Sequence, residues 1–516
     1  MDYTCERQTL CTRRLLWEGC AEQSVEQEVS LPEGGEEAAK VLKCQLFPQV
    51  VQHGVSGERV ECTGTLLLRV LFVGKESGKL CCREETAPFT ASIPVKGLGN
   101  EGMAGGDNVV CVVKPRLEFV SCTLTGPRRF SVRGSFSLCV QLLQKECRPA
   151  TAALCGDDVQ QRRLNVPGSE LQCLCLESFP LRETLELGGG KPPIAYILRS
   201  RAQCLCEETR VVSDSLLLRG RVLLEVLYTP ANESPLPEKM EFSIPFSQMV
   251  EAPGAREDGT CQVDLSVMEP DLLPRSDNLG EATRLEAKLQ LSALVTVEKR
   301  MDIPLVEDAY STRYATAPEY ETLTLQRPMG VRMDAFSQTT SVESGSELLT
   351  GVVDLWNEIA SVSAQVVSGQ LMYTGKMNVC LLAVNREGVP FYREKVMDFS
   401  AAFPMEAEGD VEAFPSLSML KLQYRIVSAS SVEVRADVQV STRLQGKTVC
   451  RVLQGLHRSG DEPLRKDTPL ILYFAQSGEP LWNIAKRYAS SVKAICEENE
   501  MTGDYASGGM LLIPGG

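Results

Sequence analysis

Histidine is scarce in this chain of 516 residues. The two histidines, His53 and His457, lie far apart in the sequence, and no HExxH, GxSxG or phosphate-loop motif is present. Most hydrolases and metalloenzymes combine histidine with a nucleophile or with other metal ligands. We therefore expect a protein that is not an enzyme and needs no cofactor.

Long apolar runs and basic clusters are also missing. The first residues mix charges among apolar side chains and lack the apolar core, roughly 7–15 residues long, of a secretion signal. Uncharged apolar runs fall well short of the roughly 18 residues that span a bilayer. The net charge is −15 and lysine and arginine are dispersed. We expect no membrane insertion, no nucleic-acid partner and a cytosolic location.

Cysteine, by contrast, is plentiful, with twenty residues. Because they are spread over a long chain expected in a reducing compartment, we predict mostly free thiols. Some of them, such as Cys62, Cys139 and Cys380, occupy strand positions as small hydrophobic residues. The alternative is a metal site formed by two CxC pairs, Cys173 with Cys175 and Cys204 with Cys206. Zinc sites favour two to four intervening residues, so no metal is predicted.

A long repeat organises most of the chain. Residues 213–228 read SDSLLLRGRVLLEVLY, and sliding the sequence so that Gly220 lies on Gly64 aligns them with residues 57–72. Sliding it the other way places Gly220 on Gly375. Apolar residues recur at every second position, which predicts a long strand. The glycine inside it indicates a bulge, a bend or a close approach by another backbone.

The register of the repeat extends to both sides of these strands. We expect the first two copies to end in a short helix or turn, at residues 154–164 and 305–314, and the third to end without one near Leu456. The pattern predicts three tandem β-rich repeat domains at residues 22–165, 175–327 and 330–456. An N-terminal extension at residues 1–21 precedes them, and a polar linker follows at residues 457–469.

The composition changes at residue 470. An apolar strand at residues 470–474 and a turn lead to a helix that starts near Pro480. A second helix is predicted at residues 491–500, with Ser490 or Ser491 as its cap, and a closing strand at residues 510–513. Residues 470–516 are thus expected to form a small βααβ domain.

This tail closely resembles a LysM domain. The matching residues are Gly478, Leu481, Trp482, Ile484, Ala485, Lys486, Tyr488, Val492, Asn499, Gly508, Leu511, Ile513 and Pro514. The sequence departs from the family at Glu479 and Pro480, where many members have Asp-Thr. With Gly478 they form the loop that in glycan-binding members helps to hold N-acetylglucosamine chains. The departure counts against sugar binding here.

The three repeats resemble the SPOCS domains of spore-coat proteins, through the apolar strand around each central glycine and the LVEDAYS segment at residues 305–311. With the tail, the architecture resembles the SipL-like family of spore-coat morphogenesis proteins. This resemblance implies a non-enzymatic adaptor of spore-coat assembly in the mother-cell cytoplasm, recruited to the forespore surface. Its LysM domain would bind the coat morphogenetic ATPase (SpoIVA-like), and other coat proteins are further candidate partners.

A second reading stays open, because LysM domains are widely used to bind glycans. The chain would then be a peptidoglycan- or chitin-binding protein of the spore cortex or cell wall. Location separates the two readings, since an adaptor lies outside the outer forespore membrane and a wall binder within the cortex.

Contact candidates in the tail come from residue type. Aromatic and methionine side chains are favoured in protein interfaces, so Trp482 and Met501 are the leading partner-binding candidates. Leu481, Ile471 and Ile495 are the next candidates. Trp482 also has a plainer interpretation, as part of the core or rim of a domain too small to cover all its apolar residues.

Overall fold

The computed structural model describes residues 2–96, 109–232, 236–278, 280–406, 410–465 and 468–515. Strands form most of it, which confirms the predicted mainly β fold. Each of the six larger sheets is built from strands of one repeat, although the strands at residues 159–186 and 314–343 begin before the predicted starts of repeats two and three. The glycine-rich stretch before Val109 lies outside the described residues.

The first repeat contains two three-stranded antiparallel sheets, ordered β1-β6-β5 and β2-β3-β4. The apolar faces of the two sheets share one core, as in a sandwich. The strands are β1 (Cys5–Ser30), β2 (Ala38–Ser56), β3 (Arg59–Gly74), β4 (Leu80–Pro94), β5 (Val109–Gly126) and β6 (Arg129–Leu154).

The second and third repeats have the same plan. In repeat two, β8-β9-β10 form one sheet, and β13 pairs with β7, β11 and β12 in the other. In repeat three the sheets are β14-β19-β18 and β15-β16-β17. The bounds are β7 (Val159–Glu186), β8 (Ile194–Val212), β9 (Ser215–Pro230), β10 (Glu238–Glu251), β11 (Thr260–Val267), β12 (Asp271–Ser276), β13 (Ala282–Ser311), β14 (Tyr314–Glu343), β15 (Leu349–Val367), β16 (Gln370–Asn385), β17 (Pro390–Pro404), β18 (Asp410–Ser428) and β19 (Ser431–Pro463).

The glycine shared by the three repeats marks a close approach of backbone, one of the three alternatives that the sequence left open. A Cβ added at Gly220 would lie 2.2 Å from the carbonyl oxygen of Leu205 and 2.8 Å from the ring of Phe246. Gly64 and Gly375 are crowded in the same way, by a carbonyl oxygen and a phenylalanine ring. The missing side chain therefore lets β2, β8 and β15 pass directly beside the central strands β3, β9 and β16.

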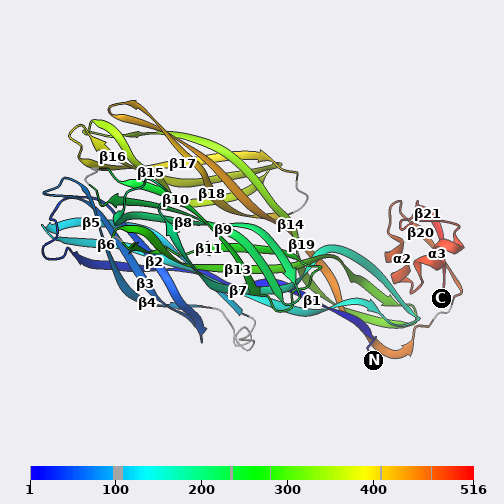
Figure 1. Ribbon diagram of the computed structural model, residues 1–516. Coiled ribbons are helices and arrows are strands. Elements are labelled where there is room, and N and C mark those ends of the chain that lie inside the picture. The colour runs from blue at the N-terminus through cyan, green and yellow to red at the C-terminus, as the bar shows by residue number, and fades with distance from the viewer. Residues whose placement is uncertain are drawn as a thin grey trace.

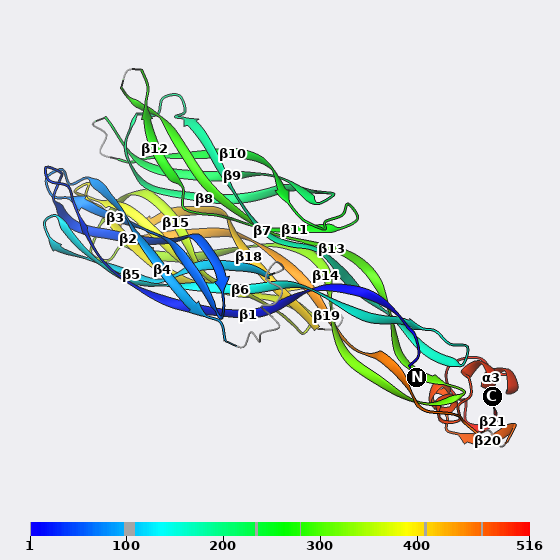
Figure 2. The same ribbon diagram turned by 90° about the horizontal axis from the view of Figure 1, so that it is seen from below.

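Three strand pairs, β1–β6, β7–β13 and β14–β19, run far beyond their sandwiches. Their outer ends come together in a stalk, which joins the sandwiches to the tail in Figures 1 and 2. Two apolar clusters fill the stalk, and both draw on all three pairs. They consist of Tyr3, Leu154, Val159, Val306, Ala309, Leu453 and Leu456, and of Leu10, Ala150, Val166, Ile303, Leu305, Leu325 and Val452.

The stalk corrects several sequence predictions. Residues 5–21 are not an extension, because they belong to β1 and pair with β6. Residues 457–463 are not linker, because they belong to β19. Of the short helix or turn expected at residues 305–314, the structure has the turn, which follows the end of β13, and a similar turn precedes β7 at residues 155–158. These segments extend because a partner strand offers them hydrogen bonds, which local pattern does not reveal.

The tail contains β20 (Leu470–Ala475), α2 (Leu481–Arg487), α3 (Val492–Glu498) and β21 (Gly509–Pro514) in the expected order. The two strands pair antiparallel. Ser491 caps α3, since its side chain accepts a hydrogen bond from the Ala494 amide at 3.0 Å. Proline 480 stands one position before α2.

Candidate functional sites

The partner-binding candidates of the tail occupy very different environments. Leu481 and Ile495 are fully buried in its core. Ile471 and Met501 are half-buried against the same core. These four residues therefore hold the tail together, and little of their surface is free to meet another protein.

Trp482 packs against the stalk. Its indole Nε1 donates a hydrogen bond to Asp308 Oδ2 at 2.8 Å. Its ring meets the edge of Tyr310, with 5.0 Å between the centroids, and Tyr310 donates a hydrogen bond to the carbonyl oxygen of Ser490 at 2.7 Å. Both stalk residues belong to the LVEDAYS segment. That segment is thus the place where repeat two holds the tail.

Asp308 carries the charge of this contact. Lys486 Nζ lies 2.7 Å from Oδ1 and 2.8 Å from Oδ2, and the Tyr320 hydroxyl donates to Oδ1 at 2.6 Å. Burial alone raises the pKa of Asp308, but the hydrogen bonds from Lys486, Tyr320 and Trp482 outweigh it and hold that pKa below its ordinary value. Burial, with the bond to Asp308, raises the pKa of Tyr320 to about 12. The carboxylate stays charged at neutral pH.

An exposed apolar strip lies on the outer face of the β20–β21 sheet, and the sequence analysis did not single it out. Leu472 is 62% exposed, Phe474 75% and Met510 58%, and Phe474 lies opposite Met510 in the strand register. A signal was present, since residues 470–474 are all apolar. A two-stranded sheet covered by helices on one face leaves alternate side chains of such a strand in solvent.

The loop proposed for glycan contact closes on itself. Glu479 accepts hydrogen bonds from the Tyr473 hydroxyl at 2.8 Å and from the Gln476 amide at 3.2 Å. Pro480 forms an isolated β-bridge with Tyr505, and Gly478 has a φ of +83°, which favours glycine. The carboxylate of Glu479 therefore holds the loop's own backbone.

The three repeats meet around equivalent residues. Leu71, Leu227 and Leu382 occupy the same position on β3, β9 and β16, and all three belong to one apolar cluster. Opposite them on β2, β8 and β15 stand Lys43, Arg199 and Asp354. One position of the repeat has thus diverged into two cations and an anion.

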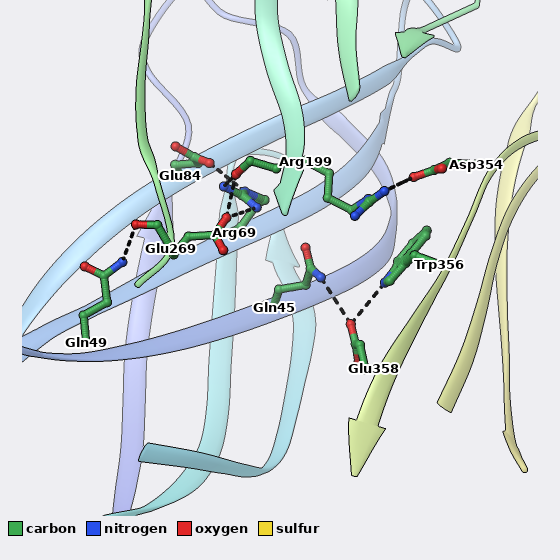
Figure 3. A network of polar contacts seen from close by, with 10 residues as sticks. Gln45, Gln49, Arg69, Glu84, Arg199, Glu269, Asp354, Trp356 and Glu358 are labelled. Carbon is green, nitrogen blue, oxygen red and sulfur yellow. Dashed lines mark hydrogen bonds and ion pairs between the residues drawn. The ribbon is translucent and has the colours of Figure 1, made fainter. Parts of the chain in front are cut away.

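Ion pairs join each repeat to the next, and Figure 3 shows the Arg199–Asp354 and Arg69–Glu269 pairs. Arg199 of repeat two lies 2.7 Å from Asp354 of repeat three, and both side chains are buried. Arg69 of repeat one lies 3.1 Å from Glu269 of repeat two. Lys43 of repeat one lies 2.7 Å from Glu394 of repeat three. Burial raises the pKa of Glu269 more than Arg69 lowers it.

A groove of about 1100 Å³ lies between repeats one and two, and β15 of repeat three lines part of it. Gln45 and Asn357 line it at 7% and 5% exposure. His53, the first of the two histidines, also lines it, and its Nε2 lies 2.9 Å from the carbonyl oxygen of Cys111. The other, His457, lies on β19 in the stalk.

The cysteines divide into two groups. Disulfide bonds join Cys11 to Cys147 and Cys20 to Cys139, which stand directly opposite one another on β1 and β6. The expectation of free thiols is wrong for these four and holds for the other sixteen. The Cys173 and Cys175 sulfurs lie 3.7 Å apart, but within the described ranges no three metal-ligating side chains gather.

Comparison with known proteins identifies one segment. The family model described as SipL, SPOCS domain, matches residues 193–270. This segment spans β8, β9, β10 and β11 of repeat two, including the strand around Gly220. Neither the curated proteins nor the solved structures contain a significant match. Within the described residues, no helix has the length and apolar character needed to cross a membrane.

Proposed function

We propose that this protein is a non-enzymatic adaptor of spore-coat assembly. The observation that carries the proposal is the match of residues 193–270 to the SPOCS domain, which indicates a sporulation-related protein. The repeat places equivalents of that segment in the first and third sandwiches. Three similar sandwiches joined by ion pairs, two of them buried, are an arrangement that suits a scaffold.

The tail, which resembles a LysM domain, is the proposed partner-binding module. Its partner is the coat morphogenetic ATPase (SpoIVA-like), as the resemblance implies. We assign the contact to Leu472, Phe474 and Met510, because they are the most exposed of the large apolar side chains that the β20–β21 sheet leaves in solvent on one face. Aromatic and methionine residues of this kind often anchor protein interfaces.

The wall-binding alternative lacks a comparable observation. In its candidate loop, Gly478 to Pro480, the Glu479 carboxylate already accepts hydrogen bonds from Tyr473 and Gln476 of the same domain. No peptidoglycan- or chitin-binding role is proposed here.

Localisation in sporulating cells of the source organism tests the proposal. A fluorescent fusion of the full chain should form a shell at the forespore surface, outside the outer forespore membrane. Deletion of residues 470–516 should disperse that shell into the mother-cell cytoplasm. A signal within the cortex would instead favour wall binding, and a diffuse signal of the full chain would contradict the adaptor role.

A further inference from the structure

The groove between repeats one and two contains polar atoms that the protein does not satisfy. Gln45 donates through Nε2 to Glu358 at 3.2 Å, which turns its Oε1 away, and this buried oxygen accepts no hydrogen bond. Asn357 accepts through Oδ1 from Arg201 at 3.0 Å, and its buried Nδ2 is left without an acceptor. Buried polar groups without partners are rare and costly, so a pair of them in one groove indicates a ligand.

Arg201 supplies a positive charge beside these groups. It lines the groove, and its guanidinium donates a hydrogen bond to Asn357 Oδ1. Burial lowers its pKa more than the neighbouring carboxylates of Glu225, Glu358 and Asp354 raise it, and across the described residues none of them lies within ion-pair distance of Arg201. Its neighbour Arg199, by contrast, is paired with Asp354. A half-buried guanidinium with free N–H groups next to a free amide N–H matches a carboxylate.

The groove also has apolar walls that are not part of any hydrophobic core cluster. Several large apolar side chains line it without belonging to the apolar clusters of the repeats. Two of them are well exposed, Val51 at 70% and Leu117 at 39%. These side chains are Phe47, Val51, Leu117, Leu176 and Leu294. They come from strands of repeats one and two that line the same groove, so they can enclose a hydrocarbon body.

We propose that this groove binds an amphipathic monocarboxylate, a small molecule with one carboxylate and an aliphatic or aromatic body. The carboxylate accepts hydrogen bonds from Arg201 and Asn357, and the body lies against Phe47 and Leu117. Gln45 Oε1 accepts from a hydroxyl or amide of the ligand where one is present. Ligand sites are usually apolar clefts with a few convergent polar groups, and this groove has that composition. The inference goes beyond the adaptor role and does not depend on it.

Calorimetric titration of the full chain with octanoate tests this proposal, with acetate and octan-1-ol as comparisons at matched ionic strength. Octanoate should bind saturably, one per chain. Acetate should bind far more weakly, because each fully buried methylene strengthens binding about fourfold. Octan-1-ol, which lacks the carboxylate, should also bind weakly.

Two matched pairs of variants locate the site. Arg201→Gln should weaken octanoate binding at least about tenfold, as expected for hydrogen bonds to a charged group. Arg219→Gln should not, since Arg219 is exposed outside the groove. Leu117→Glu should weaken binding by repulsion, whereas Leu124→Glu, at another exposed position of β5, should not. Equal affinity for octanoate and acetate, or equal effects within each pair of variants, would show that the groove holds water only and overturn the proposal.

Discussion

The indole Nε1 of Trp482 donates a hydrogen bond to Asp308 Oδ2 at 2.8 Å, so this carboxylate joins the tail to repeat two, beside the Tyr310 contact. The two residues lie in the segments that carried the two family resemblances. Trp482 belongs to the LysM-like tail, and Asp308 to the LVEDAYS segment. A residue type favoured in interfaces therefore serves a contact within the chain.

Replacing Asp308 by Asn should loosen the tail from the stalk. The change removes the charge that Lys486 faces and one of the acceptors in the contact. Hydrogen bonds to charged groups contribute about 1.5–3 kcal/mol, so the detached state should become at least about tenfold more populated. Limited proteolysis between Pro463 and Leu470 should accelerate accordingly. Asp271→Asn, which breaks an exposed ion pair with Lys288, should leave the cleavage rate unchanged. Equal rates in the two variants would contradict this account of Asp308.

Gly220→Ala should destabilise repeat two. The new methyl group would lie 2.2 Å from the Leu205 carbonyl oxygen, which belongs to backbone and cannot rotate away. Overpacking of this kind typically costs about 1–3 kcal/mol. Denaturant unfolding followed by circular dichroism measures the loss. Gly188→Ala is the control, because nothing lies within 4 Å of its added Cβ, and a similar loss there would refute the explanation.

Asp354→Ala should be among the most damaging substitutions in the scaffold. It leaves the Arg199 guanidinium buried with its main partner gone, and breaking a buried ion pair this way costs about 3–5 kcal/mol. Glu208→Ala removes an exposed partner of Arg219 and should cost about 1 kcal/mol or less. Thermal unfolding of both variants compares them. A small effect of Asp354→Ala would mean that the ion pair does not join repeats two and three.

His457 should titrate above its ordinary pKa of 6.5. The hydrogen bond to Asp2 Oδ1 at 2.7 Å and the Glu319 carboxylate, 3.3 Å from Nε2, favour the protonated ring and raise that pKa. Since the folded pKa is the higher one, the contribution of His457 to stability is complete below about pH 6.5 and is lost as pH rises through the folded value. NMR of the ring protons follows this directly. The double variant Asp2→Asn, Glu319→Gln should return the pKa towards 6.5, and an unchanged titration would exclude these partners.

The sequence predicted the features that depend on a local pattern of residues shared by the repeats. The alternation around Gly220 gave the central strands, and the glycine gave the close approach of backbone. Residues 5–21 were misread because their partner strand, β6, lies far along the chain and the segment has no strong alternation of its own. That error also hid the Cys11–Cys147 pair, which becomes visible only when the two strands are placed side by side.

Residue type alone was a poor guide to the surface of the tail. Leu481 and Ile495 fill its core, and Trp482 contacts Asp308, more than a hundred residues away in the chain. No local pattern reports such a contact. Phe474 and Leu472 could have been found, because a short strand that is apolar throughout must expose every second side chain when only one face is covered.

The adaptor role is tested most directly by measuring the affinity of the full chain for the purified coat morphogenetic ATPase by biolayer interferometry. The account predicts saturable binding that Phe474→Glu weakens at least about thirtyfold, the effect of losing a central interface anchor worth about 2 kcal/mol. Val449→Glu is the matched control, since Val449 is a 62% exposed apolar residue on β19, away from the tail. It should bind like the unaltered chain, and circular dichroism should show that both variants fold. Absence of binding by the unaltered chain, together with tight binding to purified peptidoglycan, would contradict the central claim.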